Sequence, residues 1–175
     1  MNRERLTNIA EMNESFLSDG FFIVLFHANR IPPHLGLVAN RKYFSLTATE
    51  TQVDIDINPI WRVIRSKSIE TIFIKVDYDP DLENLTMIFE NYDNVLGKEF
   101  TCLLPIKDFF ERECRMNVEG VNFVFDLIKK LKEKELIVQT FHLNLDDHIV
   151  EGSFQLQEYT LDDIYTRISD IQRTC

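Results

Sequence analysis

The sequence predicts an α+β fold in which an antiparallel sheet packs against helices. Short runs of β-branched and aromatic residues between turn signals predict strands, and apolar residues spaced three and four apart predict helices. No linker, internal repeat or low-complexity tract interrupts the chain. Because 175 residues are enough for one good core and few for two, we expect a single domain over residues 1–175.

The first part of the chain carries most of the strand signals. Residues 3–18 place apolar side chains at helical spacing, so we expect a short amphipathic helix there. The apolar run "FFIVLFHA" over 21–28 follows Gly20 and precedes two prolines, which predicts a buried strand. Residues 34–48 predict a hairpin that turns at "ANRK", and the strict alternation over 51–57 predicts the next antiparallel strand.

The middle of the chain predicts two helices around a further strand. "NPIWRVIRSK", residues 58–67, predicts a helix with Asn58 as N-cap and Pro59 in its first position, where the missing N–H costs nothing. We expect a strand over 70–79 and a helix over 80–97 that ends at "NVLG".

The last part of the chain predicts three helices and two strands. Helices are expected over 103–113, 118–137 and 160–173, the last with its first threonine as N-cap. Strands are expected over 137–144 and 148–159, joined through "LDD".

Charge and composition narrow the classes of partner. A formal net charge of −10 argues against a nucleic acid or an anionic membrane as main partner, because both select clustered Lys and Arg. No run of about 18 apolar residues is present, so we expect no membrane span and, by default, a cytoplasmic location. Three cysteines without a close pair fit a reducing compartment and give no zinc signature, and no glycine-rich nucleotide motif occurs. We therefore predict neither cofactor nor metal.

One set of residues could carry chemistry. A cysteine nucleophile needs an accessible thiolate, a base within hydrogen-bond reach and a third polar group that orients the base. Cys102 stands at the predicted start of a helix, whose positive end could lower the thiol pKa. His34 opens a predicted strand after two prolines and is the candidate base. Ser45 on the next strand, or less favourably Thr47, is the candidate that orients the ring.

These segments resemble a known family. "GFFIVLFHANRIPPHLGLVANRKYFSL" is similar to the opening of the circularly permuted papain-like fold, shared by bacterial relatives of NlpC-type peptidases and by the lecithin retinol acyltransferase group. "HLGLV" matches the histidine strand of that fold, "YFSLT" the strand with the third residue, and "FTCLLPIKDFF" the cysteine helix. The chain departs from the pattern with "GF" for "GD", "ANRK" for a glycine-bearing turn, and a hydroxyl at the third position.

The resemblance implies thiol acyl chemistry. Cys102 would be the nucleophile, His34 the base and Ser45 the orienting residue, in hydrolysis or transfer at an amide or ester through an acyl-enzyme. The substrate would be a small molecule or a peptide that carries such a bond.

Other interpretations stay open. Cys102 could be a small buried hydrophobe, and His34 could cap a strand end through backbone hydrogen bonds. His27 could replace His34 as base or form a metal pair with it, although no further ligand completes that site. The acidic stretch over 76–84 could be a solvated loop, or could bind a cation or a basic partner. The rival function is a non-catalytic interaction protein that presents its acidic surface or an exposed edge strand to a partner protein.

Overall fold

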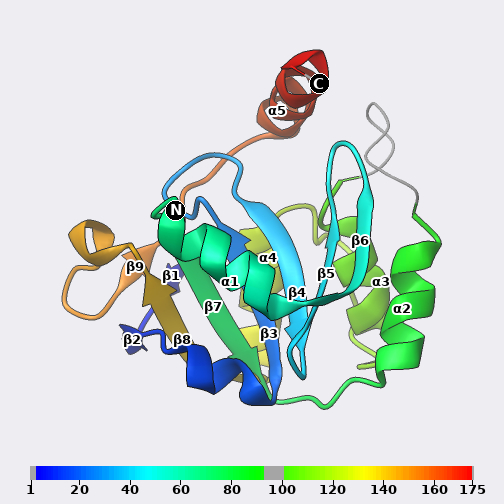
Figure 1. Cartoon of the computed structure of the whole chain (residues 1–175), viewed down its shortest axis with the longest axis horizontal. Helices are drawn as coiled ribbons and strands as arrows, with labels where there is room; N and C mark the ends of the chain where they lie inside the picture. The colour runs from blue at the N-terminus through cyan, green and yellow to red at the C-terminus, as the bar shows by residue number, and fades with distance from the viewer. Residues whose placement is uncertain (1–2, 93–100, 175) are drawn as a thin grey trace.

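An antiparallel meander forms the centre of the fold. The computed structural model describes residues 3–92 and 101–174. Within them, one seven-stranded sheet has the order β2-β8-β7-β3-β4-β5-β6, and β1 and β9 form a separate two-stranded sheet (Figure 1). The strands are β1 (Arg5–Leu6), β2 (Ile9–Glu11), β3 (Phe21–Phe26), β4 (His34–Ala39), β5 (Lys42–Leu46), β6 (Thr51–Asp56), β7 (Thr71–Val76), β8 (Ile137–Leu143) and β9 (Phe154–Gln155). The helices are α1 (Ile57–Ser66), α2 (Leu82–Glu90), α3 (Leu104–Arg112), α4 (Val124–Glu133), α5 (Leu161–Thr174) and the 3-10 turns η1 (Glu14–Ser18) and η2 (Asp146–His148).

Strand β3 lies in the middle of the larger sheet. It pairs antiparallel with β4 on one side and with β7 on the other, and all six of its residues are buried. The strand predicted from the run over 21–28 is therefore confirmed. A strand covered on both faces carries apolar residues at every position, which explains why this segment does not alternate.

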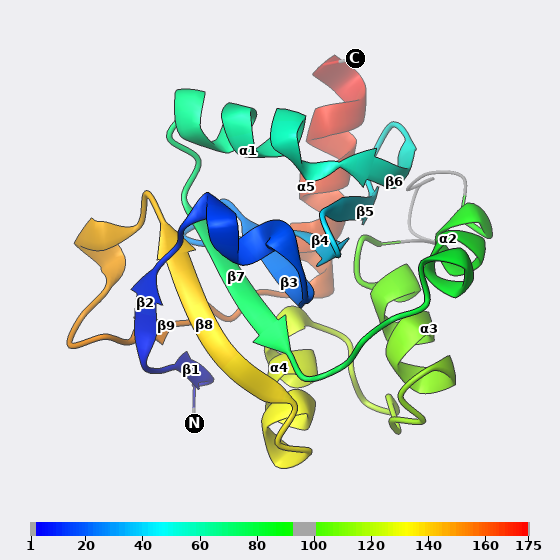
Figure 2. The same ribbon diagram turned by 60° about the horizontal axis from the view of Figure 1, so that its bottom comes forward.

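Helices cover both faces of the sheet, so two cores form. Figure 2 shows α1 on one face and α3 and α4 on the other. Phe22 and Val24 of β3 pack with Trp61 of α1, whereas Ile23 and Leu25 belong to the core under α2, α3 and α4. The α+β class with a largely antiparallel sheet is confirmed; among the strands of the described residues, only β2 and β8 pair in parallel.

The β4–β5 connection is the predicted tight hairpin. Asn40 and Arg41 have positive φ angles of 47° and 69°, as the two central residues of a type I′ turn require. The Asn40 side chain also accepts a hydrogen bond from the backbone N–H of Gly20 at 3.1 Å. This bond holds the hairpin turn against the start of β3.

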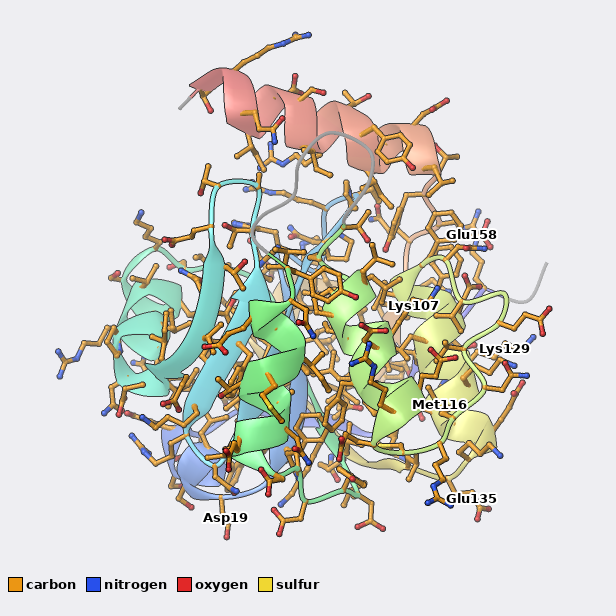
Figure 3. The ribbon with its side chains drawn as sticks, turned by 90° about the vertical axis from the view of Figure 1, so that its right-hand side faces the viewer. Asp19, Lys107, Met116, Lys129, Glu135 and Glu158 are labelled. Atoms are coloured by element: carbon orange, nitrogen blue, oxygen red, sulfur yellow. The ribbon has the colours of Figure 1, made fainter. Side chains whose placement is uncertain are left out.

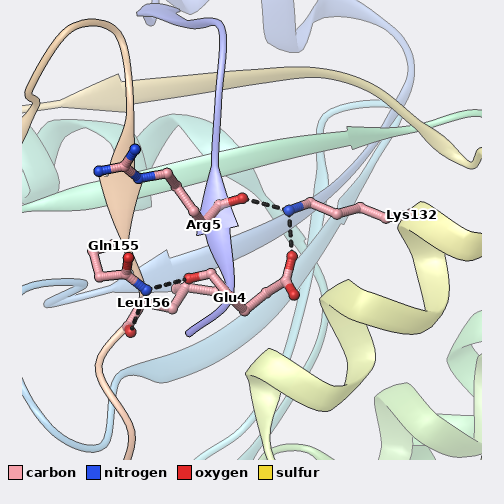
Figure 4. Close-up of polar contacts among 5 residues, drawn as sticks. All are labelled: Glu4, Arg5, Lys132, Gln155 and Leu156. Atoms are coloured by element: carbon pink, nitrogen blue, oxygen red, sulfur yellow. Dashed lines mark hydrogen bonds and ion pairs between the residues drawn. The ribbon is translucent and has the colours of Figure 1, made fainter. Parts of the chain in front are cut away.

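The helix predicted over residues 3–18 is wrong. The segment forms β1, β2 and η1 instead, because distant parts of the chain bind its backbone groups. Gln155 Nε2 donates to Glu4 O at 2.8 Å, and Lys132 Nζ of α4 contacts both the Glu4 carboxylate and Arg5 O (Figure 4). Phe16, part of the apparent apolar stripe, is 44% exposed. Pairing with the sheet thus outweighs the helical spacing.

Three further details of the fold differ from the prediction. Asp56, not Asn58, caps α1, since its carboxylate accepts from the Asn58 backbone N–H at 2.8 Å. Helix α4 spans Val124–Glu133, shorter at both ends than the predicted 118–137. The segment over 148–159 does not form a hairpin with β8, because β9 pairs with β1.

The remaining predicted elements are found. Strands β6 and β7, helix α3 and helix α5 occupy the expected segments. Helix α2 ends at Glu90, and the predicted helix end at "NVLG" lies outside the described residues. In the two described ranges, no helix is both long and apolar enough to cross a membrane.

Candidate functional site

A cavity of about 530 Å³ opens at the end of the sheet where β3 ends and β4 begins. Its volume falls in the range of small-molecule sites, about 300–1,000 Å³. Helix α1 borders the cavity on one side, and α5 lies across this end of the molecule, as Figure 3 shows. The lining side chains are mostly apolar: Phe26, His27, Arg30, Ile31, Pro32, Pro33, His34, Tyr43, Leu46, Thr47, Ala48, Thr49, Gln52, Ile60, Val63, Ile64, Ile69, Cys102, Ile164, Arg167, Ile168 and Ile171.

Strands β4 and β5 separate at the cavity. Their register ends at the pair Leu37–Phe44, although β4 continues toward His34. Beyond that pair, the backbone groups of Leu35 form hydrogen bonds with side chains. Ser45 Oγ donates to Leu35 O at 3.3 Å, and the Leu35 N–H favours the thiolate form of Cys102. The opening between the strands therefore brings Cys102 and Ser45 to the same residue of β4.

His34 is held by Ser45. His34 Nε2 lies 2.6 Å from Ser45 Oγ, and Ser45 is fully buried. Serine has one hydrogen to donate and two lone pairs that accept. Since Ser45 donates to Leu35 O, we assign the proton of the His34–Ser45 hydrogen bond to Nε2. In this tautomer Nδ1 of His34 carries the free lone pair that a base needs.

Tyr43 extends this hydrogen-bonded chain. Its hydroxyl is a third partner of Ser45, beside His34 and Leu35 O, and burial raises the pKa of the phenol far above its usual range. The rings of Tyr43 and His34 both lie 5.8 Å, centroid to centroid, from the Phe26 ring. The imidazole is thus fixed by packing as well as by Ser45.

Cys102 lies in a turn just before α3. The predicted helix start is correct, with Leu103 as N-cap and Pro105 in the first turn. The expected lowering of the thiol pKa is wrong, because burial raises the pKa of Cys102 to about 11. The backbone N–H groups of Leu35 and of Cys102 itself offset this rise only in part.

His34 is also uncharged near neutral pH. Burial, followed by repulsion from His27, lowers the pKa of His34 to about 4. In the described residues no hydrogen bond joins the Cys102 thiol to His34. The two side chains line one cavity from different layers: Cys102 packs against the core under α3, and the His34 ring lies against Phe26 of the core under α1.

The alternatives for base and orienting residue have other partners. The Thr47 hydroxyl donates to Glu50 O at 2.8 Å and accepts from the Glu50 N–H, so it is used within its own turn. His27 Nδ1 lies 3.8 Å from the Glu70 carboxylate. In the described residues, no group of three or more His, Cys, Asp and Glu side chains could hold a metal ion.

The sequence interpretation did not identify Tyr43, Arg30 or Arg167 as site residues. For Arg167 a signal was present, since it lies three residues after Ile164 and four before Ile171 in the apolar stripe of α5. A residue beside such a stripe lies at the edge of the helix face that meets the body of the protein, and Arg167 lines the cavity although its side chain is exposed. The spacing of apolar residues does not predict that α5 covers this cavity, because the position of α5 depends on contacts with distant parts of the chain.

Comparisons of the chain with protein-family models, with curated proteins and with solved structures gave no match. The resemblance to the circularly permuted papain-like fold, and the catalytic roles of Cys102, His34 and Ser45, therefore stay predictions.

Proposed function

We propose that the protein is a cysteine-dependent hydrolase or acyltransferase that acts on an amide or an ester, with Cys102 as nucleophile, His34 as base and Ser45 as orienting residue. The observation that carries the proposal is the 2.6 Å contact that fixes His34 in the cavity that Cys102 also lines. The resemblance to the permuted papain-like fold supports the same assignment of roles.

The proposed reaction begins with both groups neutral. His34 Nδ1 takes the thiol proton while Cys102 Sγ attacks the substrate carbonyl carbon. The bond from that carbon to the leaving nitrogen or oxygen breaks, and the leaving group takes the proton from His34. Water, or an acceptor alcohol or amine, then attacks the thioester carbon and gives a proton to His34; the carbon–sulfur bond breaks, and Cys102 Sγ takes that proton and becomes a thiol again.

The two pKa values set a condition on this chemistry. With the His34 pKa near 4 and the Cys102 pKa near 11, a resting thiolate–imidazolium pair is strongly disfavoured. Proton transfer must then accompany attack on the carbonyl, as in general-base catalysis, which typically contributes about 10²–10⁴-fold in rate. Removal of His34 should cost about that factor.

Acyl-enzyme formation tests the proposal. Wild type and the variants Cys102→Ala, His34→Ala and Cys114→Ser are incubated with p-nitrophenyl butyrate, and the acyl adduct is located by mass spectrometry. We expect one adduct on Cys102, slower formation in His34→Ala by about 10²-fold or more, and no change in the control Cys114→Ser. Absence of an adduct on Cys102, or equal rates with and without His34, would overturn the proposal.

A non-catalytic binding protein is the second candidate. The observation that favours it is the raised pKa of Cys102, since catalytic thiols usually have lowered values. In that case the apolar cavity would hold a ligand without turnover. The same experiment separates the two candidates, because a binding protein forms no His34-dependent adduct.

A further inference from the structure

The cavity has a charge opposite to that of the chain. The protein has a formal net charge of −10, yet the charged side chains that line the cavity are Arg30 and Arg167, and no Asp or Glu is among the lining residues. A cationic lining in an acidic protein points to an anionic ligand.

The two guanidinium groups come from different parts of the chain. Arg30 belongs to the segment between β3 and β4, and Arg167 to the middle of α5. Both lie close enough to His27 to lower its pKa by repulsion, after the larger effect of burial. Neither forms an ion pair in the described part of the chain. Since both also line the cavity, a single anion near His27 would be attracted by both charges.

One carboxylate, that of Glu70, lies near the two arginines and His27. Glu70 lies 3.8 Å from His27 Nδ1, and its pKa is lowered mainly by a hydrogen bond from its own backbone N–H and to a smaller extent by the charge of Arg30. His27 is neutral near pH 7, because its own pKa is lowered. Two positive charges and one negative charge leave one positive charge, which matches a monoanion better than a dianionic phosphate.

The rest of the cavity suits an apolar group. Isoleucine and valine side chains of α1 and α5 face it, and Ile31 and Val63 remain 46% and 43% exposed on its lining. Large aliphatic side chains left partly in water at a cavity are stabilised when an apolar ligand covers them. The ligand should thus combine one negative charge with an apolar chain.

We propose that the cavity binds an amphipathic carboxylate, such as a fatty-acid anion, with the carboxylate between Arg30 and Arg167 and the apolar chain against the isoleucines of α1 and α5. This inference rests on the cavity of the proposed function, and it adds that the amide or ester attacked by Cys102 would carry a carboxylate and an apolar chain. Because Arg167 belongs to α5 and Arg30 to the body, the bound carboxylate also holds α5 in place.

Binding of decanoate, measured by isothermal titration calorimetry below its micelle concentration, tests the inference. Arg30→Gln and Arg167→Gln should each weaken binding by about tenfold or more, since each removes one charge-assisted contact. Arg173→Gln is the matched control: it removes the same charge from a residue of α5 that does not line the cavity, and we expect unchanged affinity. Decanol and acetate, which lack the charge and the chain respectively, should each bind at least about tenfold more weakly than decanoate.

Several outcomes would overturn the inference. Equal binding of decanol would show that the arginines do not select an anion, and equal binding of acetate would show a simple anion site. Tighter binding of decyl phosphate than of decanoate would contradict the choice of a monoanion. The Cys102→Ala variant separates this inference from the proposed function: it should bind decanoate like the wild type, whether or not the wild type forms an acyl adduct.

Discussion

The phenol ring of Tyr43 covers Gly36 so closely that a Cβ atom at position 36 would lie 2.6 Å from Tyr43 Cε2. Gly36 and Tyr43 lie on neighbouring strands, β4 and β5, and Tyr43 is buried. The glycine is needed for this close approach. It lets the Tyr43 hydroxyl reach Ser45, which in turn holds His34.

Gly36→Ala should therefore destabilise the fold and disturb the His34 site. Overpacking in a filled core typically costs about 1–3 kcal/mol, because the neighbouring side chains are forced off their preferred rotamers. Urea unfolding gives the change in free energy. In a Tyr43→Ala background the same substitution should cost clearly less, since the ring that it strikes is gone. Equal costs in both backgrounds would mean that the contact is not the cause.

Asp56→Ala should destabilise α1, because Asp56 is its N-cap and accepts from the Asn58 N–H at 2.8 Å. Loss of such a cap costs about 0.5–2 kcal/mol. Asp56→Asn should retain most of the stability, since asparagine caps as well as aspartate. Asp54→Asn is a second control, because it removes only the exposed 3.7 Å ion pair with Lys42 and should change the free energy of unfolding by no more than about 1 kcal/mol. Equal losses for Asp56→Ala and Asp56→Asn would contradict the capping role.

The parts of the fold that the sequence predicted well have local causes. The hairpin from β4 to β5 depends on a two-residue turn and on alternation within neighbouring strands, and the same alternation put Ser45 beside His34. The helix predicted over 3–18 is wrong for the opposite reason, because the structure of this segment has distant causes. Its backbone is paired by β8 and β9, more than a hundred residues away, and no local spacing reports such partners.

The candidate site divides in the same way. Its residues on β4 and β5 could be found from the sequence because strand geometry places them. The raised pKa of Cys102 could not be predicted from the sequence, because the cost of desolvation depends on how α3 and the sheet bury the thiol. The position of Arg167 over the cavity depends on how α5 docks, which an amphipathic pattern leaves open.

The lowered pKa of His34 predicts acid sensitivity of the fold. Below about pH 6.5 the unfolded chain takes up a proton at His34, whereas the folded protein does so only near pH 4. The unfolded state binds more protons in this window, so the free energy of unfolding falls as the pH is lowered from about 6.5 to about 4, by up to about 3 kcal/mol from this residue.

His34→Gln should remove this contribution. Urea unfolding of wild type and variant at pH 7, 5.5 and 4.5 measures it: the wild type should lose more stability than His34→Gln as the pH falls. His148→Gln, at an exposed histidine of η2, should keep the pH dependence of the wild type. Parallel curves for wild type and His34→Gln would contradict the lowered pKa of His34.

Alkylation of Cys102 should be slow near neutral pH and should quicken about tenfold for each unit of pH, because a thiol with a pKa near 11 is almost wholly protonated at pH 8. The experiment uses iodoacetamide on a protein whose other cysteines, Cys114 and Cys175, are changed to serine. His34→Ala should leave this profile nearly unchanged, since no hydrogen bond or charge effect of His34 acts on the resting thiol.

This expectation fits the proposed function only through general-base catalysis, in which His34 acts when a carbonyl is under attack. A thiol that reacts rapidly at pH 7, and slows when His34 is removed, would instead show a resting thiolate–imidazolium pair. That result would contradict the buried, neutral Cys102 described above. Slow alkylation together with a His34-dependent acyl adduct would support the coupled proton transfer that the two pKa values require.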